Sequence, residues 1–281
     1  MKKHIITLFS LLTFLAFKTS AQSFEQQLLQ NVMQTLPNSL EISYLIKDVG
    51  IKFHKNLLNP VSNAQFYRTE AQQALNLGVY STDLGYINIY HEDAKAKSQA
   101  FIHLTAVKRL ADSLHSVDLF NFEIIQRLVL HSKDLDSLFK ITNDIFAKLD
   151  KKFHEQKKPE LSLMSLAGGW VESMYLTVSM DMEKPNKVLT HEIISQKLIL
   201  EQIEALLSFY DNKPYVHKMI VEFKKLHKLF DQVKTTKQVT KKRADGTLVV
   251  EEQQEEIPKK VLKRIFKEIT ILRNQIIKPN N

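Results

Sequence analysis

The sequence lacks cysteine, and it holds only six glycines and seven prolines among 281 residues. Without cysteine the chain has neither a disulfide framework nor a thiol that could carry a lipid anchor. The scarcity of glycine and proline argues against a fold rich in turns and favours long helices. A hydrophobic content of 44% is enough to build a core that needs no covalent staple.

Complete motifs of known enzymes are also missing. His191-Glu192 begins a zinc-protease pattern, but Ser195 stands where the second histidine ligand is required. Ser137 and Lys140 match the Ser-x-x-Lys of penicillin-recognising enzymes, without the two further motifs that accompany it there. The ten histidines are scattered and no glycine-rich phosphate loop occurs, so we expect neither a metal site nor a cofactor. The sequence therefore predicts no catalytic residue and favours a protein that is not an enzyme.

The first residues have the order of an export signal. Lys2 and Lys3 precede an apolar run from Ile5 to Phe17, and a short stretch of small and polar residues then ends at Ala21. This run is shorter than the roughly 20 residues of a membrane-spanning helix. We expect cleavage near Ala21 and a mature chain that begins at Gln22, has no transmembrane segment and is periplasmic or extracellular. A retained membrane anchor is the alternative.

Apolar residues recur at spacings of three and four over long windows, which predicts an all-α fold, a multi-helix bundle of about ten helices. The first helix opens at Leu40, behind a capping box formed by Asn38 and Glu41. Later helices are expected at Ala64–Tyr90, Ala94–Ser116, Leu119–His131, Leu135–Gln156, Leu161–Met182, Val188–Tyr210, Pro214–Val233 and Pro258–Ile277.

The residue pattern changes from helical spacing to strand-forming residues before the last helix. Asp245-Gly246 stands between two short runs of strand-forming residues, which predicts one small β-hairpin. The chain is thus expected to comprise a signal peptide at residues 1–21, a helical bundle domain at 22–233, a β-hairpin arm at 234–256 and a basic C-terminal helix at 257–281.

Two of the predicted helices are apolar on most sides and carry a few polar residues. On the first, polar and aromatic residues form a stripe. At a rotation of 100° per residue, their side chains fall within an arc of about 120° around the helix. The stripe consists of Asn76, Tyr80, Asp83, Tyr86 and Tyr90. Ala71, Gly78 and Gly85 lie on the opposite side, where small residues let a neighbouring helix approach closely. The second helix places Glu172 and Tyr175 on one face, close in sequence to Trp170.

Two interpretations of these helices remain open. In the first, Asp83 and Glu172 are buried, hydrogen-bonded packing residues. In the second, they look into a shared polar pocket of a helical enzyme or small-molecule binder. The candidate ligand-binding residues are then Asn76, Tyr80, Asp83, Tyr86, Trp170, Glu172 and Tyr175. We prefer the packing interpretation.

Positive charge is concentrated in the last quarter of the chain. Residues 213–281 contain 17 Lys and Arg against 8 Asp and Glu, whereas residues 22–212 contain 19 against 23. Such charge forms either a solvated face or a contact with an anionic surface. The candidate contact residues are Lys241, Lys242, Arg243, Lys259, Lys260, Lys263, Arg264 and Lys267.

Together these features predict an exported, non-enzymatic binding or scaffold protein of the cell envelope. Its partner is an unknown envelope protein or an anionic surface, and the hairpin and final helix are the expected contact arm. Nucleic acid is not an expected partner, because the chain is exported and has no recognition motif.

Four segments resemble a family of exported helical proteins from Bacteroidetes that has no known activity. They are Leu36–Ile42, Leu57–Pro60, Ala74–Leu84 and Gly168–Tyr175. The resemblance covers roughly Leu36 to Tyr210 and implies export and an all-helical fold. Many members resemble lipoproteins with a cysteine after the signal, and this chain departs from that pattern with Gln22.

Overall fold

The computed structural model describes residues 28–29, 39–116, 123–124, 127, 131, 134–235, 240–242, 248–250 and 255–279. The predicted export signal at residues 1–21 lies outside these residues, and so does most of the helix expected at Leu119–His131. No described helix has both the length and the apolarity needed to cross a bilayer.

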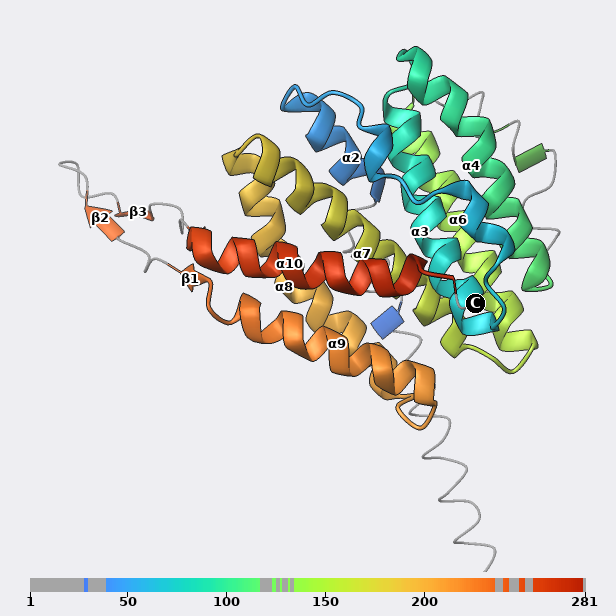
Figure 1. Ribbon diagram of the computed structural model, residues 1–281. Coiled ribbons are helices and arrows are strands. Elements are labelled where there is room, and N and C mark those ends of the chain that lie inside the picture. The colour runs from blue at the N-terminus through green and yellow to red at the C-terminus, as the bar shows by residue number, and fades with distance from the viewer. Residues whose placement is uncertain are drawn as a thin grey trace, which may run out of the picture.

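The described chain is a helical bundle, which confirms the predicted all-α class (Figure 1). Eight α-helices have both ends within the described residues, close to the expected number. They are α2 (Ser39–Asp48), α3 (Glu70–Ile89), α4 (Ala94–Ser113), α6 (Leu135–Glu155), α7 (Glu160–Glu183), α8 (Lys187–Ser208), α9 (Pro214–Phe230) and α10 (Lys259–Ile277). Two short 3-10 helices, η1 (Lys55–Leu57) and η2 (Val61–Gln65), lie between α2 and α3.

The start of α3 differs from the prediction. A helix was expected from Ala64, but α3 begins at Glu70, after the separate turn η2. The Thr69 side chain accepts a hydrogen bond from the Gln72 backbone N–H, and the Gln72 side chain accepts one from the Thr69 backbone N–H. This reciprocal capping box satisfies backbone donors at that point and fixes the helix start.

The two largely apolar helices, α3 and α7, form the centre of the bundle and pack closely together. A Cβ atom added to Gly78 would lie 1.9 Å from the Ser165 carbonyl oxygen, and one added to Gly168 would lie 2.0 Å from that of Leu75. Only glycine permits this distance between the two backbones. The small residues predicted to allow close helix packing therefore do so at Gly78.

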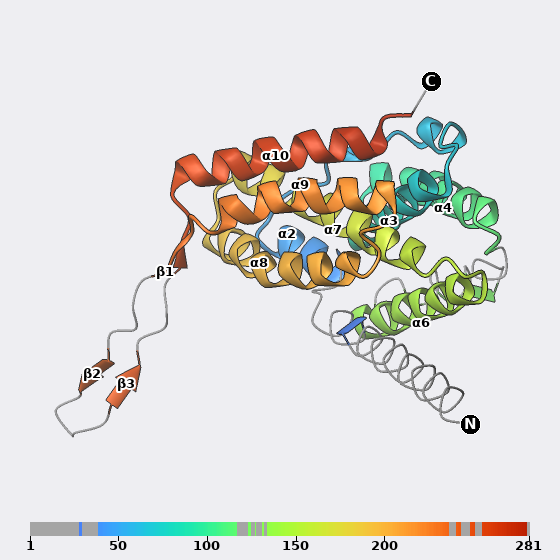
Figure 2. The ribbon, with the colours of Figure 1, turned by 90° about the horizontal axis from the view of Figure 1, so that it is seen from below.

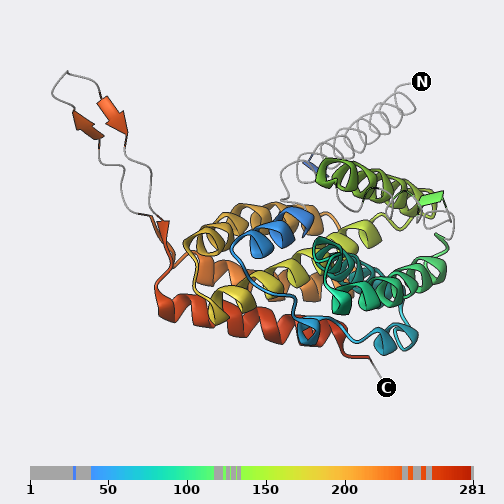
Figure 3. The ribbon, with the colours of Figure 1, turned by 90° about the horizontal axis from the view of Figure 1, so that it is seen from above.

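The other helices surround this pair. The helices α2 and α4 pack against α3, whereas α6, α8 and α10 pack against α7, and α9 lies against α8 and α10. Seen from below and from above, α6 and α10 lie on opposite sides of the bundle (Figures 2 and 3). The apolar face of α10 joins the main hydrophobic core through Val261, Ile265, Ile269, Leu272 and Ile276.

Short strands occupy the region between α9 and α10. β1 (Lys234–Thr235) pairs with β4 (Glu255–Glu256), and β2 (Thr240–Lys242) pairs with β3 (Leu248–Val250), both antiparallel. In Figure 2 the β2–β3 pair lies beyond the helical body. The predicted turn at Asp245-Gly246 lies outside the described residues and stays a prediction.

Candidate functional site

The polar stripe of α3 faces an irregular part of the same chain, the segment of residues 51–60. Each of its five residues forms a hydrogen bond with this segment. The bonds join Tyr90 Oη to Ile51 O (2.7 Å), Tyr86 Oη to His54 N (2.9 Å), Asp83 Oδ2 to Asn59 N (2.9 Å), Asn76 Oδ1 to Asn59 Nδ2 (3.4 Å) and Tyr80 Oη to Pro60 O (2.8 Å). The stripe therefore binds a segment of its own chain. This segment fills the space in which the second interpretation expected a ligand pocket.

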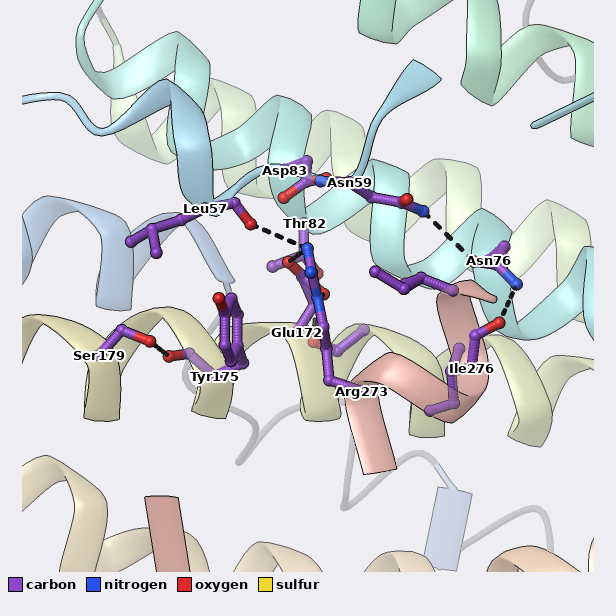
Figure 4. A network of polar contacts seen from close by, with 12 residues as sticks. Leu57, Asn59, Asn76, Thr82, Asp83, Glu172, Tyr175, Ser179, Arg273 and Ile276 are labelled. Atoms are coloured by element: carbon purple, nitrogen blue, oxygen red, sulfur yellow. Dashed lines mark hydrogen bonds and ion pairs between the residues drawn. The ribbon is translucent and has the colours of Figure 1, made fainter. Parts of the chain in front are cut away.

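Beneath this segment, Asp83 and Glu172 meet a third ionisable residue, Arg273 of α10 (Figure 4). Arg273 donates from Nε and Nη2 to the two carboxylate oxygens of Glu172, both at 2.9 Å. The two carboxyl groups are 0% exposed, and Arg273 is 5% exposed. This bidentate pair is the geometry in which arginine binds a carboxylate most strongly.

Arg273 also connects the acids to their surroundings. Its Nη2 atom donates to the Leu57 carbonyl oxygen at 2.8 Å, so it contacts the same segment that the α3 stripe holds. The guanidinium lies 4.5 Å from the centre of the Tyr175 ring, a favourable cation–π contact. One buried arginine thus joins α10 to α7 and to the segment 51–60.

The two buried carboxyl groups differ in how strongly Arg273 opposes the rise of their pKa, because Arg273 forms hydrogen bonds with Glu172. Burial raises the pKa of Asp83 well above its usual range, and the negative charge of Glu172 raises it further, against the opposing effect of Arg273. Burial also raises the pKa of Glu172, but the charge and hydrogen bonds of Arg273 oppose that rise. We infer that Asp83 keeps its proton and Glu172 is ionised, so that the cluster holds one negative and one positive charge.

The hydrogen bonds agree with this assignment. Asp83 Oδ2 accepts from the Asn59 backbone, whereas no donor group of the described residues reaches Asp83 Oδ1. A proton on the Asp83 carboxyl group makes this group a donor to Glu172 and removes the repulsion between the two carboxyl groups. The hydrogen bonds therefore support the inference that Asp83 is protonated beside an ionised Glu172.

His103 of α4 lies next to this cluster. Its Nδ1 donates to the Gln99 carbonyl oxygen at 3.1 Å, and its Nε2 lies 4.0 Å from Asp83 Oδ2, too far for a hydrogen bond. The residue is 2% exposed, and burial lowers its pKa. His103 is therefore neutral at pH 7, and its Nε2 is an acceptor without a partner among the described residues.

Of the seven candidate ligand-binding residues, Trp170 lies apart from the others. Its Nε1 donates to Gln196 Oε1 at 2.8 Å. Its ring packs edge-on against the ring of Phe223 of α9, and the two ring centres are 5.3 Å apart. Residues two positions apart on a helix point about 200° apart, so Trp170 and Glu172 face different sides of α7. The structure brings Asn76, Tyr80, Asp83, Tyr86, Glu172 and Tyr175 around the segment 51–60 and Arg273, and places Trp170 against α8 and α9.

The predicted surface residues of α10 are exposed. They are Lys259, Lys260, Lys263, Arg264 and Lys267. Lys241 and Lys242 belong to β2, and Arg243 lies outside the described residues. The outward face of α10 is thus basic, whereas its inward face carries Arg273 into the core.

Three important residues of the cluster were not predicted: Asn59, His103 and Arg273. A signal for Arg273 exists in the sequence, because it stands four residues after Ile269 and eight after Ile265, on the apolar side of α10. An arginine on an apolar face needs a buried partner. Asn59 and His103 carry no comparable signal, because their neighbours come from distant parts of the chain.

The chain matches no family model, no curated protein and no solved structure. The resemblance to exported helical proteins of Bacteroidetes therefore stays a prediction.

Solvent does not reach the carboxyl groups of Asp83 and Glu172, and both are bound to other parts of the protein. A substrate would have to displace the segment 51–60 or Arg273 to touch them. The cluster therefore serves packing, as the first of the two interpretations expects.

Proposed function

We propose that this chain is an exported, non-enzymatic protein of the cell envelope that binds an anionic lipid surface through the outer face of α10. The observation that carries the proposal is the arrangement of cations on this helix. Lys260, Lys263 and Lys267 recur at helical spacing on its exposed side, and no ion pair of theirs is found among the described residues. Glu268 is the only acidic residue of α10.

The core fixes the orientation of this face. Because the opposite side of α10 packs against α7 and α9, its lysines point outward along a helix roughly 28 Å long. Each lysine near an anionic membrane contributes about 1 kcal/mol to binding. Ile271, which is 39% exposed, lies on the same side and offers an apolar contact to the lipid boundary.

The neighbouring helix α9 is also rich in exposed lysine. Its exposed residues include Lys218, Lys224, Lys225 and Lys228. Among them Lys225 is paired with Glu222 at 2.7 Å. Two adjacent helices that both carry excess lysine favour a broad, flat anionic surface over a single small anion.

Export is part of the proposal and rests on the order of residues 1–21. Mass spectrometry of the cell-associated protein should find a mature N-terminus at or near Gln22. A full-length cytoplasmic protein would contradict the export step, but it would leave the lipid-binding step open to the vesicle measurement below.

The binding test uses vesicles of phosphatidylcholine with or without phosphatidylglycerol, and co-sedimentation of the mature protein. We expect binding to the anionic vesicles only, and a decrease with added salt because exposed charges are screened. The triple variant Lys260→Glu, Lys263→Glu and Lys267→Glu should lose binding.

A control with the same change of net charge is Lys97→Glu, Lys140→Glu and Lys148→Glu, at exposed lysines of α4 and α6. This control should retain most of the binding. Equal losses in the two variants would show that net charge alone attracts the protein, and the proposal for α10 would be wrong.

A further inference from the structure

A groove of about 990 Å³ separates the segment 53–62 from the first half of α4. It is lined on one side by residues 53–56 and 58–62, and on the other by Lys95, Ser98, Gln99, Ile102 and His103. Its size lies within the range of sites for small molecules, roughly 300–1,000 Å³. The sequence gives no sign of this groove, because its two sides are separate in the chain and one of them contains only short 3-10 turns.

One wall of the groove is held rigidly by buried side chains. Tyr86 binds the backbone of His54, Asp83 binds that of Asn59, and Tyr80 binds that of Pro60. Arg273 binds the Leu57 carbonyl from the other direction. An irregular segment fixed by so many buried groups is preorganised, which is what a binding site requires.

The charges that line the groove have one sign. Lys55 and Lys95 lie at its exposed edge, and no carboxylate is among its described lining residues. Three carboxyl groups lie next to lining residues and have other roles. Asp93 caps α4 through Lys95 N, and Glu183 lies 3.4 Å from His54 Nε2. Asp83, which we infer to be protonated, accepts from Asn59 N. The groove therefore attracts an anion.

The remaining lining is partly apolar. Phe53, Leu58, Val61 and Ile102 offer a surface for a hydrocarbon or aromatic group. At the floor, His103 is neutral and holds an unused acceptor, as described above. Small-molecule sites combine such apolar surface with polar groups that orient the ligand.

We propose that this groove binds a small organic anion whose carboxylate or phosphate group is held by Lys55 and Lys95 and whose apolar body lies against Phe53 and Ile102. The site is distinct from the outer face of α10 and does not depend on lipid binding there. The buried stripe of α3 then has a role beyond packing, because it fixes one wall of the site.

The test measures binding of anilinonaphthalene sulfonate by its fluorescence, with decanoate and decanol as competitors. We expect saturable binding with one site per chain, displacement by decanoate and little displacement by neutral decanol. The double variant Lys55→Glu and Lys95→Glu should weaken binding roughly tenfold or more, because two attractive charges become repulsive.

The matched control is Lys52→Glu with Lys97→Glu, which changes exposed lysines next to the groove in the same segment and the same helix. It should change binding by less than about threefold. A second variant, Ser98→Trp, fills the groove from an exposed position and should abolish binding while the melting curve stays unchanged.

Three outcomes would overturn the proposal: no saturable binding, unchanged binding in Ser98→Trp, or equal losses in the two double variants. The α10 triple variant separates the two proposals, because it should lose vesicle binding and keep binding of the fluorescent anion.

Discussion

Arg273 and Lys267 belong to the same helix, but Arg273 is buried against Glu172, whereas Lys267 is exposed and has no ion pair among the described residues. Both are cations on α10, and their surroundings differ. Removing a partner from a buried pair leaves an unpaired charge in the core, whereas changing an exposed charge alters little but the surface potential. The cluster of Asp83, Glu172 and Arg273 should therefore control stability, and the outer face of α10 should control binding.

The largest expected effect is the loss of the buried anion. Glu172→Ala leaves the Arg273 guanidinium buried without its carboxylate, which should cost about 3–5 kcal/mol of unfolding free energy. Urea unfolding of the variant and the parent measures the difference. Glu155→Ala, at an exposed position of α6, should change stability by less than about 0.5 kcal/mol. Similar losses of unfolding free energy in the two variants would contradict the difference expected between buried and exposed charges.

A second test concerns the close approach of α3 and α7, which brings the two acids together. Gly168→Ala places a Cβ atom 2.0 Å from a backbone oxygen and should cost about 1–3 kcal/mol or more. In Gly169→Ala the nearest atom is the Thr82 hydroxyl oxygen at 3.3 Å, so a small adjustment of one side chain suffices. Thermal unfolding should thus separate these two adjacent glycines, and equal melting temperatures would contradict the close packing.

The third test asks whether Asp83 is protonated. Asp83→Ala leaves the Asn59 N–H without its acceptor and should cost about 1–3 kcal/mol. Asp83→Asn keeps an acceptor for Asn59 and supplies a donor toward Glu172, so its stability at neutral pH should equal or exceed that of the parent. A large loss in Asp83→Asn would mean that the aspartate is ionised.

The pH dependence follows from the same shift. The unfolded chain releases the Asp83 proton near pH 3.9, whereas the raised pKa makes the folded chain keep it to higher pH. The contribution of Asp83 to stability is thus present below about pH 4 and is lost as pH rises through the folded pKa. The advantage of Asp83→Asn over the parent should therefore grow from about pH 5 to about pH 8 in urea unfolding. The opposite shift of His103 is common to both proteins and cancels in this difference.

The smallest expected change in stability belongs to the α10 surface. The triple variant Lys260→Glu, Lys263→Glu and Lys267→Glu should alter the unfolding free energy by less than about 0.5 kcal/mol per site, because the lysines are exposed. The same variant should lose vesicle binding. A strong destabilisation would show that these lysines support the fold, and the division between core and surface charges would not hold.

Much of the helix pattern could be predicted from the sequence. The helix expected at Leu135–Gln156 is α6 (Leu135–Glu155), and the one expected at Leu161–Met182 is α7 (Glu160–Glu183). These ends depend on local signals, such as the break at Pro159, that act within a few residues. The predicted start of α3 was wrong by six residues. Apolar spacing continues through η2, so the capping box at Thr69 was not recognised as the helix start.

The candidate site could be predicted only in part. The stripe of α3 was identified correctly as a set of residues sharing one side, because 100° per residue is a property of any α-helix. What that side contacts was not predictable. The segment 51–60 has no regular periodicity. Most of its bonds to the stripe are made by backbone groups, which are the same in every sequence and so give no signal.

By itself, the sequence determined the helical class, most helix ends, the exposed basic face of α10 and the two acids on the central helices, because each follows from the spacing and chemistry of nearby residues. Only the tertiary structure decided that the acids meet and that Arg273 joins them. That contact spans 101 residues of chain from Arg273 to Glu172 and 216 from Arg273 to Leu57. Such pairs form because helix packing brings their side chains within 3 Å, and no local pattern records which helices become neighbours.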